Sequence, residues 1–263
     1  MFSSCSFEEL PAEHPTARQI FELPPATQGT EASDAITLPV SGPLPRSKAD
    51  VLQMYKEAAD LVKLRCPGFV CTIENHAANF RSPARENGLF DAVQSILMEN
   101  DQSADTVTTV QKGDDLACRT YFPVFHTDYG CLLSDHSIVK GATCYADGSL
   151  YNILILFEEQ IDPDPVNSAF AQIMTPFTDS ALLQSLNAYL PALNSSNTQA
   201  TLRYYNCEIR CTLDSETGEM VSLSHKMIAD VELQVAVEMV FTDLDGQLTC
   251  TLIHHADYTS FDW

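Results

Sequence analysis

The sequence predicts an α+β fold in which a curved antiparallel sheet, shaped like half of a barrel, packs on a few helices. An amphipathic helical pattern begins at Ser47, and the last third of the chain alternates apolar and polar residues in three runs separated by turn residues. Strands with one apolar face must bury it against another layer, and the helix expected over 47–66 is the obvious cover. With 263 residues and 45 % hydrophobic content, the chain can form a substantial core.

Residues 1–46 are predicted to be a disordered tether. They contain Ser, Thr, Ala and Glu and no sustained apolar period, and their prolines are Pro11, Pro15, Pro24, Pro25, Pro39, Pro43 and Pro45. Such a composition cannot bury enough apolar surface to offset the entropy lost on ordering. The folded body is therefore expected over 47–263, as a single α+β domain.

The first elements of that domain follow from caps and periodicity. Ser47 is a good N-cap, Asp50 stands three residues later, and apolar residues recur at helical spacing up to Pro67-Gly68, which ends the helix. A strand is expected over 69–80, where apolar side chains alternate. A second helix is expected over 88–101, followed by a polar loop over 100–116.

The middle of the chain reads as a hairpin and two short helices. Asp147-Gly148 is a typical hairpin turn, and the apolar run 151–157 is typical of a central strand. The segments 162–174 and 180–191 are expected to be short helices. The Asp-Pro-Asp-Pro sequence at 162–165 lacks the ligand spacing of a calcium loop, so a rigid turn is the simpler interpretation.

The last portion, 198–263, predicts a meander of three long strands joined by turns at 214–218 and 244–246. Each strand has one apolar face. The residues expected on that face are Tyr205, Cys207, Ile209, Cys211 and Leu213; Val221 and Leu223; Val231, Leu233, Val235, Val237, Met239 and Phe241; and Leu248, Cys250 and Leu252.

The net charge of −22 excludes some partners. Nucleic acids and anionic membranes are bound through Lys and Arg, so a strongly acidic surface repels both. No run reaches the roughly 18 apolar residues of a membrane-spanning helix. Attachment to a membrane is therefore expected only through a lipid anchor.

The nine cysteines leave an even number once Cys5 is set aside. Eight thiols permit disulfides in an oxidising compartment but do not require them, since they can equally be small buried hydrophobes. Cys207 and Cys211 share a strand face roughly 13 Å apart, which is too far for a disulfide.

A polar cluster at 125–136 is the strongest candidate for metal chemistry. It contains His126, Asp128, Cys131, Asp135 and His136, all of which are possible zinc ligands. Their spacing matches no established site, so a solvated loop is the preferred interpretation, and no metal or other cofactor is expected.

The remaining histidines also favour structural roles. His254 and His255 are adjacent on a strand and therefore point to opposite faces. His225 falls on the apolar register of its strand, which favours a hydrogen-bonded histidine of the core or its rim.

Three stretches, SKADVLQMYKEAADLVKLRCPGFVCT, SLYNILILFEEQIDPDP and the terminal TLDSETGEMVSLSHKM … LDGQLTCTLIHHADYTSFDW, resemble surface lipoproteins of Gram-positive bacteria. Those proteins are in turn similar to the lipoprotein-carrier fold, a curved antiparallel sheet around helices that holds acyl chains. The resemblance implies a cell-surface, extracytoplasmic location. It also implies lipid attachment at Cys5, because Ser3-Ser4-Cys5 offers two small residues before the cysteine, although Phe2 stands where Leu is usual. It implies no catalytic residues.

Two functions from different classes therefore remain open. The first is an extracytoplasmic lipoprotein of the cell envelope whose sheet and helices enclose an apolar cleft that binds a lipid or another hydrophobic ligand. The alternative is a non-catalytic structural or protein-interaction module with a solid core, which presents an acidic face to another envelope protein. A metal-dependent enzyme centred on His126–His136 is the third and least favoured reading, because nucleophile, base and cofactor motifs are not found in the sequence.

Overall fold

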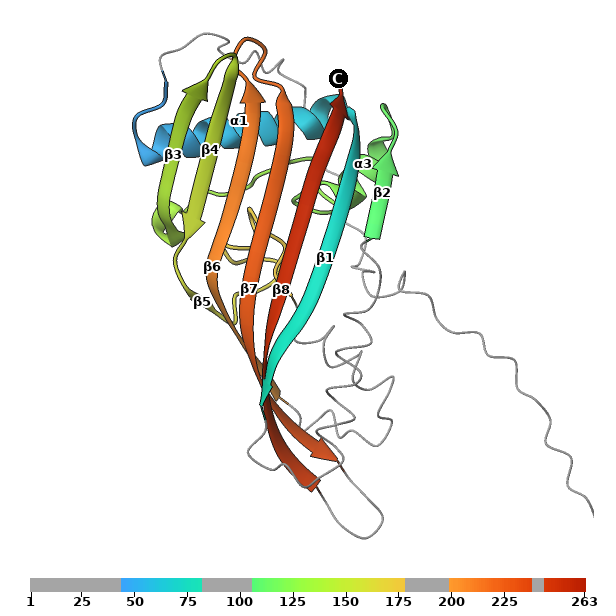
Figure 1. Cartoon of the computed structure of the whole chain (residues 1–263), viewed down its shortest axis with the longest axis vertical. Coiled ribbons are helices and arrows are strands. Elements are labelled where there is room, and N and C mark those ends of the chain that lie inside the picture. Colours follow the sequence, from blue (N-terminus) through green and yellow to red (C-terminus); the bar gives the residue numbers. More distant parts are fainter. Residues whose placement is uncertain (1–43, 82–105, 178–198, 238–243) are drawn as a thin grey trace, which may run out of the picture. The chain divides into compact units, whose positions relative to one another are not determined.

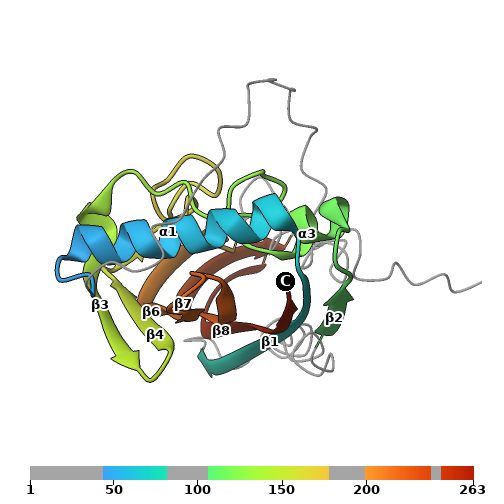
Figure 2. The same cartoon turned by 90° about the horizontal axis from the view of Figure 1, so that it is seen from above.

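The computed structural model describes residues 44–81, 106–177, 199–237 and 244–263. Their main feature is an eight-stranded antiparallel sheet in the order β2-β1-β8-β7-β6-β4-β3, with the short β5 paired to β6 (Figure 1). The sheet curves strongly, and β2 and β3 form its two ends, so it remains open rather than closing into a barrel (Figure 2).

The strands are β1 (Gly68–Arg81), β2 (Thr106–Val110), β3 (Val139–Asp147), β4 (Leu150–Phe157), β5 (Gln160–Ile161), β6 (Gln199–Asp214), β7 (Met220–Val237) and β8 (Leu244–Asp262). The helices are α1 (Lys48–Arg65), α3 (Asp115–Tyr121) and a one-turn 3-10 helix at His136–Ile138. The three longest strands, β6 to β8, form the predicted meander.

Helix α1 begins and ends where the sequence predicts. The Ser47 hydroxyl accepts a hydrogen bond from the Asp50 amide at 3.1 Å, and the Asp50 carboxylate accepts one from the Ser47 amide at 3.2 Å. This reciprocal capping box satisfies two amides that the helix itself leaves unpaired. At the other end Cys66 adopts a left-handed conformation with φ 44° and stops the helix. Helix α1 lies across the concave side of the sheet (Figure 2).

Several predicted strands and turns are confirmed. The strand expected over 69–80 is β1, and the predicted hairpin turn directly follows Asp147, with Gly148 at φ 60° and Ser149 as the two loop residues between β3 and β4. Strand β4 is paired on both sides, by β3 and β6, as the apolar run 151–157 indicates. The turn at 214–218 is held by the Asp214 carboxylate, which accepts the amides of residues 216 and 217.

Three element predictions are wrong. The polar stretch 100–116 contains β2, whose β-branched residues pair with the first half of β1, and α3 already begins at Asp115. The segment 162–174 forms successive turns instead of a helix, and its backbone bonds mix i→i−4 and i→i−3 spacing, as in the bonds from Met174 and Ile173 to the Phe170 carbonyl. The sequence 244–246 belongs to β8, where Gly246 pairs with Val235, so the β7–β8 connection lies earlier in the chain.

Two side chains are on the opposite side from the predicted face. Tyr205 is only partly buried because the ladder shifts register between Tyr205 and Glu208, where Asn206 takes a positive φ of 49°. Such a bulge moves every preceding side chain to the other face, so Leu202 and Tyr204 point inward instead. Val221 is 43 % exposed, and its neighbour Met220 is buried in its place.

Some expectations fall on residues outside the described ones. These are the tether, of which only 44–46 is described, with the lipid-attachment residue Cys5, the helices expected over 88–101 and 180–191, and the two apolar-face residues Met239 and Phe241. Val235 and Val237 continue β7 and pair with β8.

Candidate functional sites

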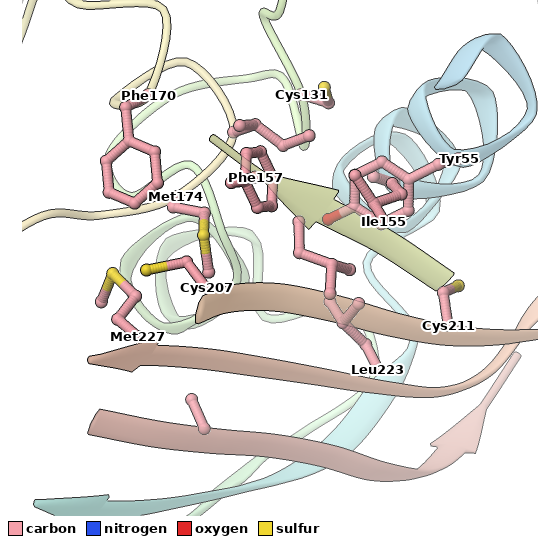
Figure 3. Close-up of a cluster of buried hydrophobic side chains, with 14 of the residues drawn as sticks. Tyr55, Cys131, Ile155, Phe157, Phe170, Met174, Cys207, Cys211, Leu223 and Met227 are labelled. Carbon is pink, nitrogen blue, oxygen red and sulfur yellow. The ribbon is translucent and has the colours of Figure 1, made fainter. Parts of the chain in front are cut away.

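Large apolar side chains pack on the concave side of the sheet, both under α1 and under the 165–174 turns (Figure 3). Tyr55 and Cys131 lie close to Ile155 and Phe157 of β4, while Phe170 and Met174 approach Cys207 and Met227. Tyr55, Ile155, Phe170 and Met174 are each completely buried.

Two groups of aromatic rings fill the two ends of this interior. Phe69, Phe122, Tyr258 and Phe261 lie with ring centroids 5.5 to 6.5 Å apart. Phe157, Phe170, Tyr204 and Phe177 form the second group, at 5.3 to 6.1 Å. These are ordinary packing distances for aromatic side chains, so both groups are in direct contact.

One polar pair joins α1 to the middle of the sheet. The Tyr55 hydroxyl and Nε2 of His225 on β7 are 3.1 Å apart, and both side chains are buried. Burial lowers the pKa of His225 from 6.5 to about 3, helped by His254, because the interior disfavours the charged imidazolium. His225 is therefore neutral at physiological pH and acts as the polar contact between helix and sheet, as its register predicts.

The candidate apolar-face residues Val231 and Leu233 also lie on the concave side, at 2 % and 1 % exposure. They pair laterally with Leu202 and Ala200 of β6 and with Cys250 and Leu248 of β8. The apolar wall thus continues along the meander away from α1.

Charged side chains of α1 that do not face the sheet form hydrogen bonds with the backbone of residues 119–139. The Lys63 ammonium, 4 % exposed, donates to the carbonyl oxygens of Arg119, Phe122 and Val124 at 3.2, 2.7 and 3.2 Å. Burial lowers the pKa of Lys63 to about 8. One turn earlier the Asp60 carboxylate accepts the amides of Gly130 and Cys131, at 2.9 and 3.2 Å.

Two further lysines complete this attachment. The Lys56 ammonium binds Asp60 at 2.7 Å and the Cys131 carbonyl at 2.6 Å. Lys48, near the start of α1, donates to the carbonyls of His136 and Val139 at 3.2 and 2.8 Å. Spacing of 48, 56, 60 and 63 places these residues along one stripe of the helix.

The polar cluster at 125–136 is used in this attachment. Asp128 forms an ion pair with Arg119 at 2.9 Å, Asp135 caps the 3-10 helix, and Cys131 is buried against α1. His126 donates its backbone amide to the Arg119 carbonyl, and His136 contributes a carbonyl to Lys48. Among the residues that the structure describes, no three His, Cys, Asp or Glu side chains come together as a metal site. The segment is a loop whose charged residues Asp128 and Asp135 are exposed, as the sequence predicts, while Gly130, Cys131 and Leu133 are buried.

The convex face of the sheet carries a polar row that the sequence did not reveal. Glu74, His255, Lys226 and Glu208 stand side by side on four adjacent strands, and Asp257, Ser224 and Arg210 form the next row. We call these seven residues the outer belt. These residues come from four strands, β1, β6, β7 and β8, and only the strand register brings them together.

Ser224 and His255 are the chemically most suggestive pair of the outer belt. The Ser224 hydroxyl lies 2.8 Å from Nε2 of His255, whose Nδ1 is 3.9 Å from Glu74. However, Asp257 also approaches Nε2, at 3.3 Å, and Ser224 pairs with Arg210 and Asp257 in the ladder on both sides. Acyl transfer needs free N–H donors beside the nucleophile, whereas this backbone is used in the sheet. The backbone on both sides of Ser224 is therefore part of the sheet ladder.

His254 points to the other face, as predicted. Its Nδ1 is 2.8 Å from the Asn75 side-chain oxygen, and its ring contacts Phe177 edge to face at 5.9 Å. The two adjacent histidines consequently serve different sides of the sheet.

Comparison of the chain with protein-family models, with curated proteins and with solved structures finds no match. Within the described residues, no helix has the length and apolar character needed to cross a membrane.

Proposed function

We propose that this protein is a non-catalytic binding module of the bacterial cell envelope, which presents an acidic outer face of its sheet to a basic partner protein. Residues 1–46 would tether it, and a lipid on Cys5 would anchor it outside the cytoplasm. The curved antiparallel sheet with α1 on its concave side is compatible with the lipoprotein-carrier type of fold.

The proposal depends on the close packing of the described side chains on the concave side. The Tyr55–His225 hydrogen bond joins α1 to the sheet, Phe69, Phe122 and Tyr258 are in direct contact, and Phe170 of the 165–174 turns packs against Tyr204 of β6. A carrier needs room for its ligand, whereas close-packed side chains form an ordinary core. We therefore propose that binding takes place at the surface of the sheet.

The outer belt supplies the surface chemistry. Carboxylates of Glu74, Asp257 and Glu208 are interspersed with Lys226 and Arg210 on a rigid antiparallel sheet. The net charge of −22 means that the partner which gains most from long-range attraction is positively charged. Alternating charges on adjacent strands would then fix the register of the complex.

A hydrophobic-ligand carrier is the second candidate, favoured by one specific observation. The apolar wall formed by Leu202, Val231, Leu233 and Leu248 extends along β6 to β8, where strands of 16 to 19 residues continue past α1. A movable cover over this wall would open a groove for an acyl chain.

Uptake of a fluorescent long-chain fatty acid by delipidated protein distinguishes the two candidates. The solid-core proposal predicts no saturable uptake, while an albumin assayed in parallel gives the positive signal. Saturable uptake that Leu233→Trp abolishes, with the thermal unfolding midpoint maintained, would replace the proposal by the carrier function.

A further inference from the structure

The C-terminal end of α1 brings two cysteine sulfurs from distant parts of the chain together. Sγ of Cys66, the C-cap residue, donates to the Lys63 carbonyl at 3.2 Å. Sγ of Cys118, on α3, donates to the Val62 carbonyl at 3.7 Å. These two carbonyls belong to consecutive residues of the last helical turn, so both sulfurs lie at one end of α1.

Two other cysteine pairs in the described residues are too far apart to form a disulfide. Cys144 and Cys211 stand in one row of the sheet, but Ile153 of β4 separates them, which places them roughly 10 Å apart across two strand spacings. Cys207 and Cys211 are on one strand and too far apart to bond. Sulfur atoms must approach to about 2 Å in a disulfide, with α-carbons usually less than 7 Å apart.

We propose that Cys66 and Cys118 form a disulfide that ties the end of α1 to α3 when the protein folds in an oxidising compartment. The structure holds both as thiols. The proposed bond is independent of the proposed function, since it concerns how the fold is secured and not what it binds.

The reaction is thiol–disulfide exchange with a small disulfide such as oxidised glutathione. One cysteine thiolate attacks the glutathione disulfide and expels a glutathione thiolate, which leaves a mixed disulfide on the protein. The second cysteine thiolate attacks the protein sulfur of that mixed disulfide and expels a second glutathione thiolate. The two thiol protons go to the two glutathiones, so two protein thiols and one glutathione disulfide give one protein disulfide and two reduced glutathiones.

Burial determines when this reaction takes place. Cys66 and Cys118 are 4 % and 0 % exposed, and burial raises the pKa of both thiols, that of Cys66 to about 12. Attack requires a thiolate and an open path, so the folded protein reacts slowly. Oxidation is expected during folding, when both cysteines are accessible and the closing of α1 on α3 brings them together.

The test is refolding of fully reduced protein from denaturant in a mixture of reduced and oxidised glutathione. Free thiols are then blocked with iodoacetamide in denaturant, and the digested chain is mapped by mass spectrometry. The proposal predicts a peptide linking Cys66 to Cys118 as the main cross-linked species, with the other six of the eight described cysteines alkylated. Alkylation of both Cys66 and Cys118, or a principal link between other cysteines, would overturn it.

Thermal unfolding supplies a second measurement. Cys118 follows Cys66 by 118 − 66 = 52 residues, and a bond closing a loop of that length is expected to raise the Tm by about 10 °C. Cys66→Ser should remove both the linked peptide and this redox-dependent rise, whereas Cys71→Ser, another buried cysteine, should keep both. An oxidised protein with the linked peptide but the same Tm as the reduced one would contradict a bond that fits the native fold.

Discussion

At the scale of single residues, Lys63 is the most constrained charged side chain of the described structure. Its ammonium is almost completely buried and donates to three backbone carbonyls of the 119–124 region. If the ammonium were removed, the buried Phe122 carbonyl would lose its lysine donor, whereas the Arg119 carbonyl would keep the His126 amide and the Val124 carbonyl would keep the Thr127 hydroxyl. Buried polar groups without partners cost about 1 to 3 kcal/mol each.

Lys63→Met is accordingly expected to lower the free energy of unfolding by about 1 to 3 kcal/mol. Methionine keeps a similar volume, so the loss reports on the hydrogen bonds and not on a cavity. Lys140→Met is the matched control, because Lys140 is exposed on the edge strand β3 and its replacement should change stability by less than about 0.5 kcal/mol. Urea unfolding measures both, and equal effects would show that the Lys63 contacts contribute little.

Gly130 is constrained by the backbone of α1. A β-carbon added there would lie 2.3 Å from the Ala59 carbonyl oxygen and 2.4 Å from its carbonyl carbon. Neither is the end of a flexible side chain, so the helix or the 122–139 segment would have to move.

Gly130→Ala should therefore cost about 2 to 4 kcal/mol, as expected for overpacking against backbone. Gly141→Ala serves as the control, since a β-carbon at Gly141 meets no atom within 4 Å. Thermal unfolding of the two variants gives the comparison. A Gly130→Ala protein as stable as Gly141→Ala would mean that the segment is not seated on α1 as described.

At the scale of elements, α1 shows how local sequence signals define a helix. The capping box of Ser47 and Asp50 fixes its start, and Lys63 and Arg65 stand in its last turn, where cations interact favourably with the helix dipole.

Ser47→Ala should destabilise the fold by about 1 kcal/mol, the usual value for a lost N-cap. Ser149→Ala in the exposed β3–β4 turn should have almost no effect in the same urea titration. Similar losses in both would contradict the role of the cap.

Elements with a strong local pattern could be predicted from the sequence, and those that depend on distant partners could not. Helix α1, β1 and the β6–β8 meander have caps, turns or long alternation. Strand β2 is five residues long and is stabilised by pairing with β1, so its sequence alone reads as a polar loop. The bulge at Asn206 likewise has no signal in the alternation that it interrupts.

The candidate sites are harder to predict for the same reason. The Tyr55–His225 bond joins residues separated by 170 positions, and the outer belt exists only once four strands are in register. The sequence placed His225 on the inner face, but it could not supply its partner. The charge spacing of Lys56, Asp60 and Lys63 along α1 was visible, yet a solvated helix face gives the same pattern.

At the scale of the whole molecule, the neutral buried His225 couples stability to pH. An unfolded histidine takes up a proton below pH 6.5, whereas the folded one resists protonation until about pH 3. The unfolded state therefore binds more protons between these values, and acid favours unfolding. The contribution of neutral His225 to the free energy of unfolding is fully present above pH 6.5. It declines as the pH falls below this value, by up to about 1.4 kcal/mol per pH unit.

His225→Gln separates this contribution from that of the carboxylates. Glutamine can still bond to the Tyr55 hydroxyl but does not titrate, so the variant should lose stability less steeply between pH 6 and pH 4 than the original protein. Denaturant unfolding at a series of pH values measures the two slopes. Parallel slopes would mean that His225 is accessible to protons in the folded state.

The central claim is that α1 and the β6–β8 meander share one solid core, and a double-mutant cycle of Tyr55→Phe and His225→Phe tests it most directly. The structure predicts that the two substitutions are coupled by about 1 kcal/mol or more in the free energy of unfolding, because they remove the two partners of one buried hydrogen bond. Strictly additive effects, with a coupling energy of zero within error, would show that the helix is not docked on β7 and would contradict the account.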